Sequence, residues 1–384
     1  MATIKQYTDK DGTTRYQFQL YLGVDPQDGK KKTTRRRGFK TKKEATLALS
    51  RLTLDLQQKG SLVEENNILF ETVYHEWYQQ YVNTVRESTW ARTAKMFDNH
   101  ILPLFGNKRL RTITVNQCQK AVNKWFGEVT YNYTRWYNYL TAVFDYGIRQ
   151  EYITDNPAKR VTMPKKPTEW GEKPANFWSK SQLATFFNCI NQQDEPEKYT
   201  LFRVLAFCGL RRGECLALTW QDIDFEHQTM SINKTLTQGD RGKQIIQAPK
   251  TKKGMRVISL DPQTTDVLKH WRSQQRRMFL ELGFNTMNTD QLIFANTKNR
   301  FKSLNMPAKW LTKIIDDNHL EPRITVHGFR HSHASALFSA GASIKEVQTR
   351  LGHEDAQTTL NIYTHVTKNQ EKAAVEKLVN YLNF

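Results

Sequence analysis

Two polar stretches divide the chain into three segments, and each segment has its own hydrophobic period. Residues 60–67 are polar, and residues 163–176 hold three prolines, three lysines and no helical period, so both are typical of linkers. A chain of 384 residues has room for two or three domains. We predict domains at 1–65, 66–162 and 177–384, with 163–176 as a linker.

The first segment is predicted to form a small sheet followed by one helix. Residues 14–21 (TRYQFQLY) alternate in polarity and favour a strand, and residues 31–39 can return as a second strand. Thr41 and Glu44 have the spacing of a capping box, which predicts a helix start. Beyond that start, Ala45 and Leu49 keep helical spacing, so one face of the helix is expected to be buried.

The second segment has a helical period throughout. Phe70, Val73 and Trp77 fall on one face, and a following helix is expected to end before Pro103. Thr114 is placed to cap a third helix. A fourth helix is predicted over 131–152, so this segment is an all-α unit of roughly 90 residues.

The third segment is mainly helical with a small sheet. Helices are expected over 179–190 and 199–208 and again after Pro262, and three short strands over 229–237, 244–248 and 256–260. The fold class is therefore α+β and multidomain, with a three-stranded antiparallel sheet in a mainly α third domain. An amphipathic helix near 370–382 is expected to dock on a neighbouring protomer or to pack on its own domain.

The charge of the chain calls for a polyanionic partner. Lys and Arg number 57 against 38 Asp and Glu, a net charge of +19. Basic surfaces bind phosphate backbones through counterion release, so nucleic acid is the leading partner and a merely soluble basic protein the alternative. Residues 30–43 hold nine Lys or Arg, and the candidate DNA-binding residues there are Lys30, Lys31, Lys32, Arg35, Arg36, Arg37 and Lys40. An edge strand protected by its charges from aggregation is the alternative for this run.

Composition sets aside several other classes of protein. The sequence has no run of 18 apolar residues, so no membrane span is expected, and residues 1–10 have no apolar stretch typical of a secretory signal. Four irregularly spaced cysteines fit neither a disulfide framework nor a metal knuckle. We expect a protein of the reducing cytoplasm.

Four motifs of the third segment belong together. They are Gly-Leu-Arg-Arg-Gly-Glu at 209–214, Pro-Lys-Thr-Lys-Lys-Gly at 249–254, His-Gly-Phe-Arg-His at 327–331 and Leu-Gly-His at 351–353, with Tyr363 ten residues later. In order and spacing this set resembles the tyrosine recombinase family, specifically the integrases of phages and conjugative transposons. The resemblance covers the whole chain, because the longer integrases join an arm-binding domain, a helical core-binding domain and a catalytic domain.

The resemblance implies a set of catalytic roles. Rejoining DNA without loss of bond energy requires a covalent intermediate, and Tyr363 would form it as a 3′-phosphotyrosyl link. Arg211 and Arg330 would bind the non-bridging oxygens, and Lys250 would protonate the leaving 5′-oxygen. His327 would accept the tyrosine proton or bind the phosphate, and His353 would hold a phosphate oxygen. No metal and no cofactor is expected.

Neighbouring residues compete for some of these roles. Arg212 is the rival of Arg211, whereas Lys252 and Lys253 are rivals of Lys250. Glu214 is expected to brace a helix or an arginine, and His331 and His333 to be structural or to support a catalytic side chain. A zinc site is the alternative function for the clustered histidines, but the sequence there lacks the glutamate of an HExxH motif.

The sequence therefore predicts a site-specific DNA recombinase that integrates and excises a mobile element of a bacterium. Its expected partners are double-stranded DNA at core and arm sites, three further copies of the chain in a synaptic tetramer, an excisionase and DNA-bending proteins. A chromosomal resolvase and a type IB topoisomerase share the chemistry but do not call for the basic N-terminal module. The alternative of a different class is a catalytically inactive architectural or regulatory protein with the same fold.

Overall fold

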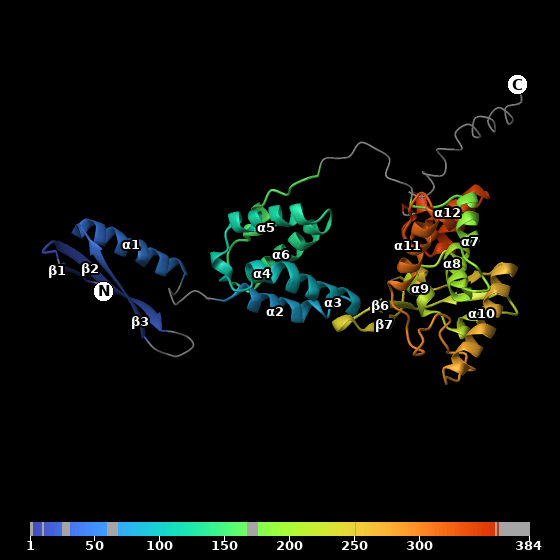
Figure 1. The fold of residues 1–384 in the computed structure, drawn as a ribbon. Helices are drawn as coiled ribbons and strands as arrows, with labels where there is room; N and C mark the ends of the chain where they lie inside the picture. The colour runs from blue at the N-terminus through green and yellow to red at the C-terminus, as the bar shows by residue number, and fades with distance from the viewer. Residues whose placement is uncertain are drawn as a thin grey trace, which may run out of the picture. The chain divides into compact units, whose positions relative to one another are not determined.

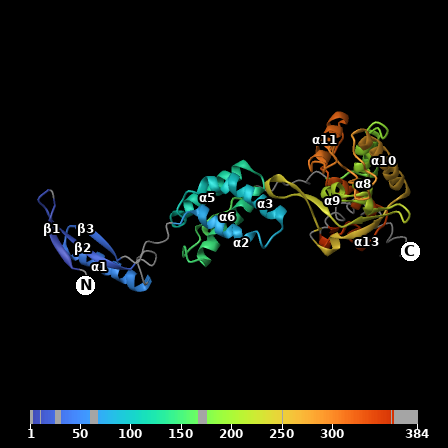
Figure 2. The ribbon, with the colours of Figure 1, turned by 90° about the horizontal axis from the view of Figure 1, so that it is seen from below.

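The computed structural model describes residues 3–9, 11–24, 31–59, 68–166, 176–249, 251–357 and 359–360. The chain divides into two compact units, one of residues 1–86 with 92–167 and the other of residues 87–91 with 168–384. Figures 1 and 2 show the ribbon from two sides. The three-domain boundaries stay a prediction, and the predicted helix at 370–382 lies outside the described residues.

The N-terminal region is a three-stranded antiparallel sheet with one helix against it. Its elements, in strand order β1-β2-β3 and then the helix, are β1 (Ile4–Thr8), β2 (Thr14–Val24), β3 (Lys31–Phe39) and α1 (Lys42–Lys59). Phe18 of β2 is 1% exposed and stacks on Phe39, which anchors the face against α1. The Glu44 amide donates to Thr41 Oγ1 at 3.1 Å, which confirms the predicted helix start. β1 was not predicted from the sequence, because its five residues lack the alternation of a strand, as their burial also shows.

The region that follows is a helical bundle around an aromatic core. Its helices are α2 (Phe70–Tyr81), α3 (Glu87–Met96), the π-helical turn η1 (Phe97–Ile101), α4 (Leu102–Phe105), α5 (Val115–Glu128) and α6 (Asn132–Arg149). Phe70, Phe97 and Phe144 are fully buried in it. Thr114 caps α5 as predicted. The helix expected to end before Pro103 is α3, which ends at Met96, as predicted. Helical structure then continues through η1 into α4, whose first turn holds Pro103, where its missing N–H is not needed.

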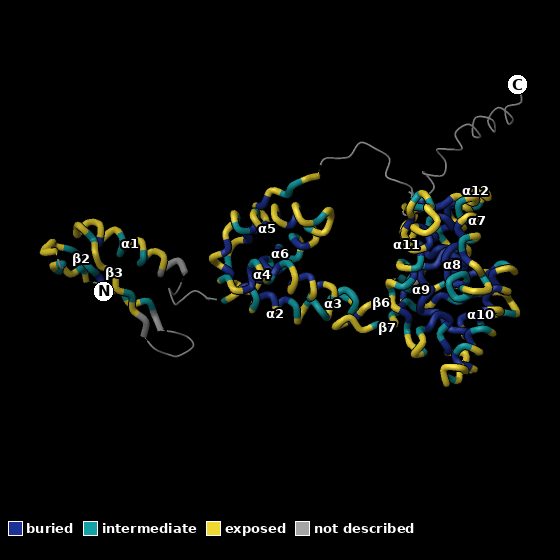
Figure 3. Tube along the Cα trace, in the orientation of Figure 1, coloured by how far each residue is buried: buried dark blue, intermediate teal, exposed yellow. Residues whose placement is uncertain are grey.

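The second unit is built around the buried helix α8, as Figure 3 shows. Its helices are α7 (Lys180–Asn188), α8 (Pro196–Cys208), α9 (Arg212–Ala217), α10 (Pro262–Glu281), α11 (Met306–Asn318), α12 (Gly328–Ser339) and α13 (Ile344–Leu351). Phe202 of α8 packs on Phe186 of α7 and on Phe329 of α12. This packing fixes the first turn of α12, which carries Arg330 and follows directly after His327.

The predicted three-stranded sheet is present with a different set of strands. It consists of β4 (Ile223–Asp224), β5 (Thr229–Ile232) and β8 (Arg256–Ser259), while β6 (Thr235–Gln238) and β7 (Gln244–Gln247) form a separate hairpin. The strand expected over 229–237 breaks after Ile232. Between its halves, where the backbone turns, Lys234 Nζ lies 2.6 Å from Oδ2 of the buried Asp222.

No helix in the described part of the chain is both long and apolar enough to cross a membrane.

Candidate active site

Four of the six predicted catalytic residues are described, and all four lie at helix ends. Arg211 precedes α9, His327 precedes α12, Arg330 is in the first turn of α12, and His353 follows α13 by two residues. Lys250 and Tyr363 lie outside the described residues. Backbone groups at helix ends have no partner within the helix, so several helix ends can direct polar groups at one ligand.

Arg330 brings two of these helix ends together. Its Nη1 donates to the carbonyl of Gly209 at 2.8 Å, and its Nη2 donates to the carbonyl of Leu351 at 2.5 Å. Gly209 stands two residues before Arg211, and Leu351 stands two residues before His353. Because Arg330 is 1% exposed, these contacts are made in the interior and hold Arg211 and His353 near one guanidinium.

Two glycines allow the close approach of these segments. Gly209 ends α8 at φ +65°, and a Cβ there would lie 2.6 Å from His333 Cδ2 and 2.8 Å from Leu351 Cδ2. Gly352 has φ +68°, and a Cβ there would lie 2.6 Å from the carbonyl oxygen of Lys253. Both positions therefore require glycine. The second contact places the turn that follows Lys250 against the turn that leads to His353.

The cluster carries excess positive charge. Burial, together with the nearby Arg211, lowers the pKa of Arg330 to about 9, so the group is still a cation at neutral pH. Among the described residues, no carboxylate pairs with Arg330. The Arg211 side chain is 42% exposed, and its Nη1 lies 2.7 Å from Glu214 Oε1. A desolvated cation held by carbonyls beside a second, half-exposed cation is suited to bind an anion such as phosphate.

The two histidines are neutral at pH 7. His327 is exposed as a residue, yet the surrounding atoms of the site desolvate its ring, and this burial, then His331 and Arg330, lowers its pKa below the ordinary value. Burial, then Arg330 and Arg211, lower the pKa of His353 to about 3. His353 Nδ1 also lies 2.8 Å from the hydroxyl of the fully buried Thr359, four residues before Tyr363. A neutral imidazole can accept a proton, as a general base must.

Two residues that the motifs did not single out for a role here support the cluster. Arg256 contacts Glu214, and Arg350 Nε donates to Nε2 of His333 at 3.1 Å. The other ring nitrogen of His333 lies 2.9 Å from the carbonyl of Ala206, so this histidine is structural, as expected. No sequence signal singled out Arg256, because Val257 and Ile258 are both apolar. Only the fold shows that Arg256 shares a strand face with the buried Ile258 while Val257 points outward.

Metal ligands are not gathered at this site. In the ranges that the structure describes, no group of three His, Cys, Asp or Glu side chains is arranged to hold a metal ion. His333 is buried against Arg350, while His327 is exposed beside His331.

The basic run of the first segment lies on the edge strand β3. Strand register pairs Arg35 with Gln19 and Arg37 with Gln17, on the face opposite Phe18 and therefore away from α1. Arg36 pairs with Phe18 and so belongs to the other face. Arg35, Arg36, Arg37 and Lys40 are all exposed. Lys30 lies outside the described residues, and Lys31 and Lys32 are described only as backbone of β3.

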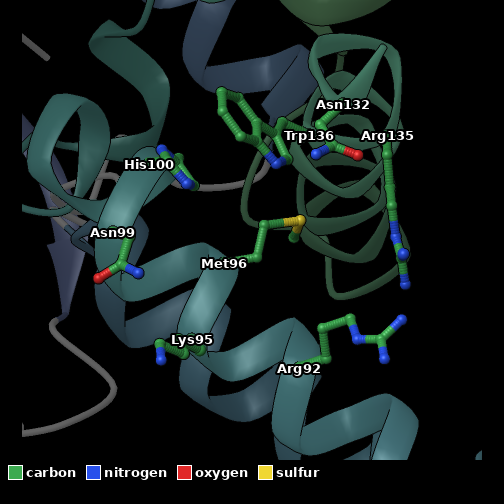
Figure 4. Close-up of a pocket in the computed structure, with 8 residues that line it drawn as sticks. All are labelled: Arg92, Lys95, Met96, Asn99, His100, Asn132, Arg135 and Trp136. Carbon is green, nitrogen blue, oxygen red and sulfur yellow. The ribbon is translucent and has the colours of Figure 1, made fainter. Parts of the chain in front are cut away.

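The helical region has a basic cleft of about 210 Å³ between α3, η1 and α6 (Figure 4). Arg92, Lys95 and Arg135 supply three cations at its rim. Its wall holds the rings of His100 and Trp136, stacked with centroids 3.7 Å apart. Cationic side chains contact nucleic acid backbones, and flat aromatic rings stack on bases, so this cleft has side chains for both kinds of contact.

Comparisons with known sequences cover nearly the whole chain. The model of the phage integrase family matches residues 176–370, that of a SAM-like N-terminal domain of phage integrases matches residues 69–126, and that of an arm DNA-binding domain matches residues 4–56. The ICEBs1 integrase of Bacillus subtilis is 27% identical over 372 residues, which are 96% of this chain and 98% of that protein. A XerC-like tyrosine recombinase of Caldanaerobacter subterraneus is 29% identical over 389 residues, covering 96% and 97%.

Solved structures share the fold. The Tn1549 transposon integrase in complex with a circular intermediate DNA superposes with a TM-score of 0.65 at 19% identity, over 81% of this chain and 99% of that chain. A lambda integrase dimer bound to a core site gives a TM-score of 0.57 at 15% identity, over 93% of each chain.

Proposed function

The chain belongs to the phage integrase family and is a tyrosine-type site-specific recombinase, and we propose that it cuts and rejoins DNA through a 3′-phosphotyrosyl intermediate to integrate and excise a mobile element. One observation carries this proposal. Arg330 is a buried cation beside Arg211, and its hydrogen-bond acceptors are backbone carbonyls. These are the carbonyl of Gly209, just before Arg211, and the carbonyl of Leu351, just before His353. A scissile phosphate is the anion that such a site suits.

In the cleavage of one strand, each of these residues has its own role. The Tyr363 oxygen attacks phosphorus, the tyrosyl bond forms, and the bond from phosphorus to the 5′-oxygen breaks. His327 takes the tyrosine proton, and Lys250 gives a proton to the leaving 5′-oxygen. Arg211 and Arg330 bind the non-bridging oxygens as their charge grows, and His353 holds one of them. Fixed donors of this kind typically contribute 10²–10³-fold each.

Lys250 and Tyr363 enter this scheme through their match to the family motifs. In the second step the 5′-hydroxyl of the partner strand gives its proton to Lys250 and attacks phosphorus. The bond from phosphorus to the Tyr363 oxygen breaks, and His327 returns a proton to Tyr363. Each bond broken is replaced by one of the same kind, so no nucleotide hydrolysis is required.

DNA contacts extend beyond the active site in this proposal. The exposed face of β3 with Arg35 and Arg37 binds arm sites, and the basic cleft with Arg92 and Arg135 binds the core site. Four chains join two core sites in a synaptic tetramer in the bacterial cytoplasm, with an excisionase and DNA-bending proteins setting direction. Two binding regions on one chain raise the effective concentration of each for its DNA.

Recombination of DNA that carries candidate attachment sites, taken from any direct repeats found in the DNA around the gene, tests the proposal. The purified full-length chain should exchange these sites in EDTA and without ATP. Arg330→Met should abolish exchange while core-site binding stays within about tenfold, since most affinity comes from other phosphate contacts. DNA binding with no exchange under any of these conditions would favour the architectural alternative.

A further inference from the structure

Strand β8 carries a charged side chain on its buried side. The Arg256 side chain is 6% exposed, and its nitrogens reach three separate segments. Nε donates to the carbonyl of Arg350 at 2.8 Å, Nη1 to the carbonyl of Gly254 at 3.1 Å, and Nη2 to Glu214 Oε2 at 3.0 Å. One guanidinium thus joins the end of α13, the turn before β8 and the start of α9.

Glu214 lies between two guanidiniums. Its Oε1 accepts from Arg211 Nη1 at 2.7 Å, while Oε2 accepts from the Arg211 amide and from Arg256 Nη2, both at 3.0 Å. Burial would raise the pKa of Glu214, but the charge and hydrogen bonds of Arg256, then those of Arg211, outweigh it and hold that pKa below its ordinary value. Glu214 is therefore a carboxylate whose charge is shared.

This sharing decides where the Arg211 guanidinium lies. If Arg256 were absent, Glu214 would be a buried carboxylate with Arg211 as its one arginine partner. The whole negative charge of Glu214 would then act on Arg211. It would draw the Arg211 guanidinium inward and neutralise the positive charge that would otherwise bind an anion. With Arg256 present, the Arg211 side chain stays 42% exposed.

We propose that Arg256 is a positioning residue of the recombination reaction: it fixes Glu214 and thereby holds the Arg211 guanidinium toward the scissile phosphate. This inference rests on the proposed function. A misplaced catalytic group can cost on the order of 10²-fold in rate, so the effect is measurable.

The test compares two substrates for the full-length chain. Each is a nicked suicide duplex of the core site, with either a phosphate or a methylphosphonate at the scissile position. The methylphosphonate lacks the negative charge that Arg211 binds, so its cleavage should depend little on where Arg211 lies. Relative to wild type on the same substrate, Arg256→Met should form covalent adduct about 100-fold more slowly on phosphate and within about fivefold on methylphosphonate.

Two further variants keep the test decisive. Arg256→Lys retains a charge beside Glu214 and should show a smaller loss, about tenfold, with the same dependence on substrate. Adding Arg256→Met to Glu214→Gln should slow cleavage no further than Glu214→Gln alone, because both changes act through one carboxylate.

Arg203 provides the matched control. Its side chain is also 6% exposed and pairs with Asp261 at 3.0 Å in the same unit. Arg203→Met should therefore change both substrates by the same factor. A defect of equal size on both substrates in Arg256→Met, or in Arg256→Lys if the first variant does not bind DNA, would overturn the inference. Absence of any adduct with the wild-type chain would instead contradict the proposed function.

Discussion

Acidification should loosen the helices that carry the active site, through His333. This ring is 7% exposed, with Nδ1 at 2.9 Å from the carbonyl of Ala206 and Nε2 accepting from Arg350. Nδ1 therefore carries the proton and Nε2 has none, since Arg350 can only donate. A second proton on Nε2 would break the bond to Arg350. Burial first, then Arg350, lowers the pKa of His333 to about 4 from 6.5.

The sign of the effect follows from this lowered pKa. Above pH 6.5 the ring is neutral in both the folded and the unfolded chain, so it adds nothing to the pH dependence of stability. As the pH falls from 6.5 toward 4, the unfolded chain binds a proton that the folded chain excludes, and stability is lost. Between pH 7.5 and pH 5.0 the loss is about 2 kcal/mol, or about 30-fold in an opening equilibrium.

Hydrogen exchange of the α12 amides at the two pH values, corrected for intrinsic rates, measures this loss locally, which suits a chain of several units. His333→Gln removes the titratable group. The wild-type chain should lose about 30-fold more protection on acidification than the variant. Equal losses in both proteins would refute the assignment of His333 as a neutral, buried link between α8, α12 and α13.

Three further predictions concern the site and the DNA contacts. Gly209→Ala should destabilise the second unit by roughly 1–3 kcal/mol and lower its thermal midpoint, because its Cβ would meet His333 and the φ of +65° disfavours alanine; an unchanged midpoint would contradict the close approach. Arg35→Gln with Arg37→Gln should weaken arm-site binding and reduce its salt dependence, with core-site cleavage unaffected; an unchanged salt slope in a filter-binding titration would contradict the arm assignment. Arg92→Gln with Arg135→Gln should weaken core-site binding about uniformly across sequences and leave the cleavage rate of saturated complexes unchanged; normal affinity would exclude the cleft from the interface.

Local patterns in the sequence were sufficient for most helices. The capping residue Thr114 marked the start of α5, and the spacing of Phe70, Val73 and Trp77 identified the buried face of α2. Both signals act within a few turns of one helix, so they survive whatever the rest of the chain does.

Contacts between distant segments could not be predicted in the same way. Glu214 and Arg256 stand 42 residues apart, and nothing near either position specifies the other. The sheet shows the same limit, because the strand expected over 229–237 breaks where Lys234 pairs with the buried Asp222. Residue order along the motifs predicted which side chains form the site, but the carbonyls that hold Arg330 are visible only in the fold.

The proposed reaction depends on attack of Tyr363 on the scissile phosphate. The direct measurement incubates the full-length chain with a nicked suicide substrate labelled on the scissile strand, digests the trapped adduct with trypsin and locates the attached nucleotide by mass spectrometry. We predict a 3′-phosphate linked to Tyr363 and a free 5′-hydroxyl on the released strand. We also predict no adduct with Tyr363→Phe, while that variant still binds the site. An adduct on another residue, a 5′ linkage, or wild-type yield from Tyr363→Phe would contradict this role of Tyr363.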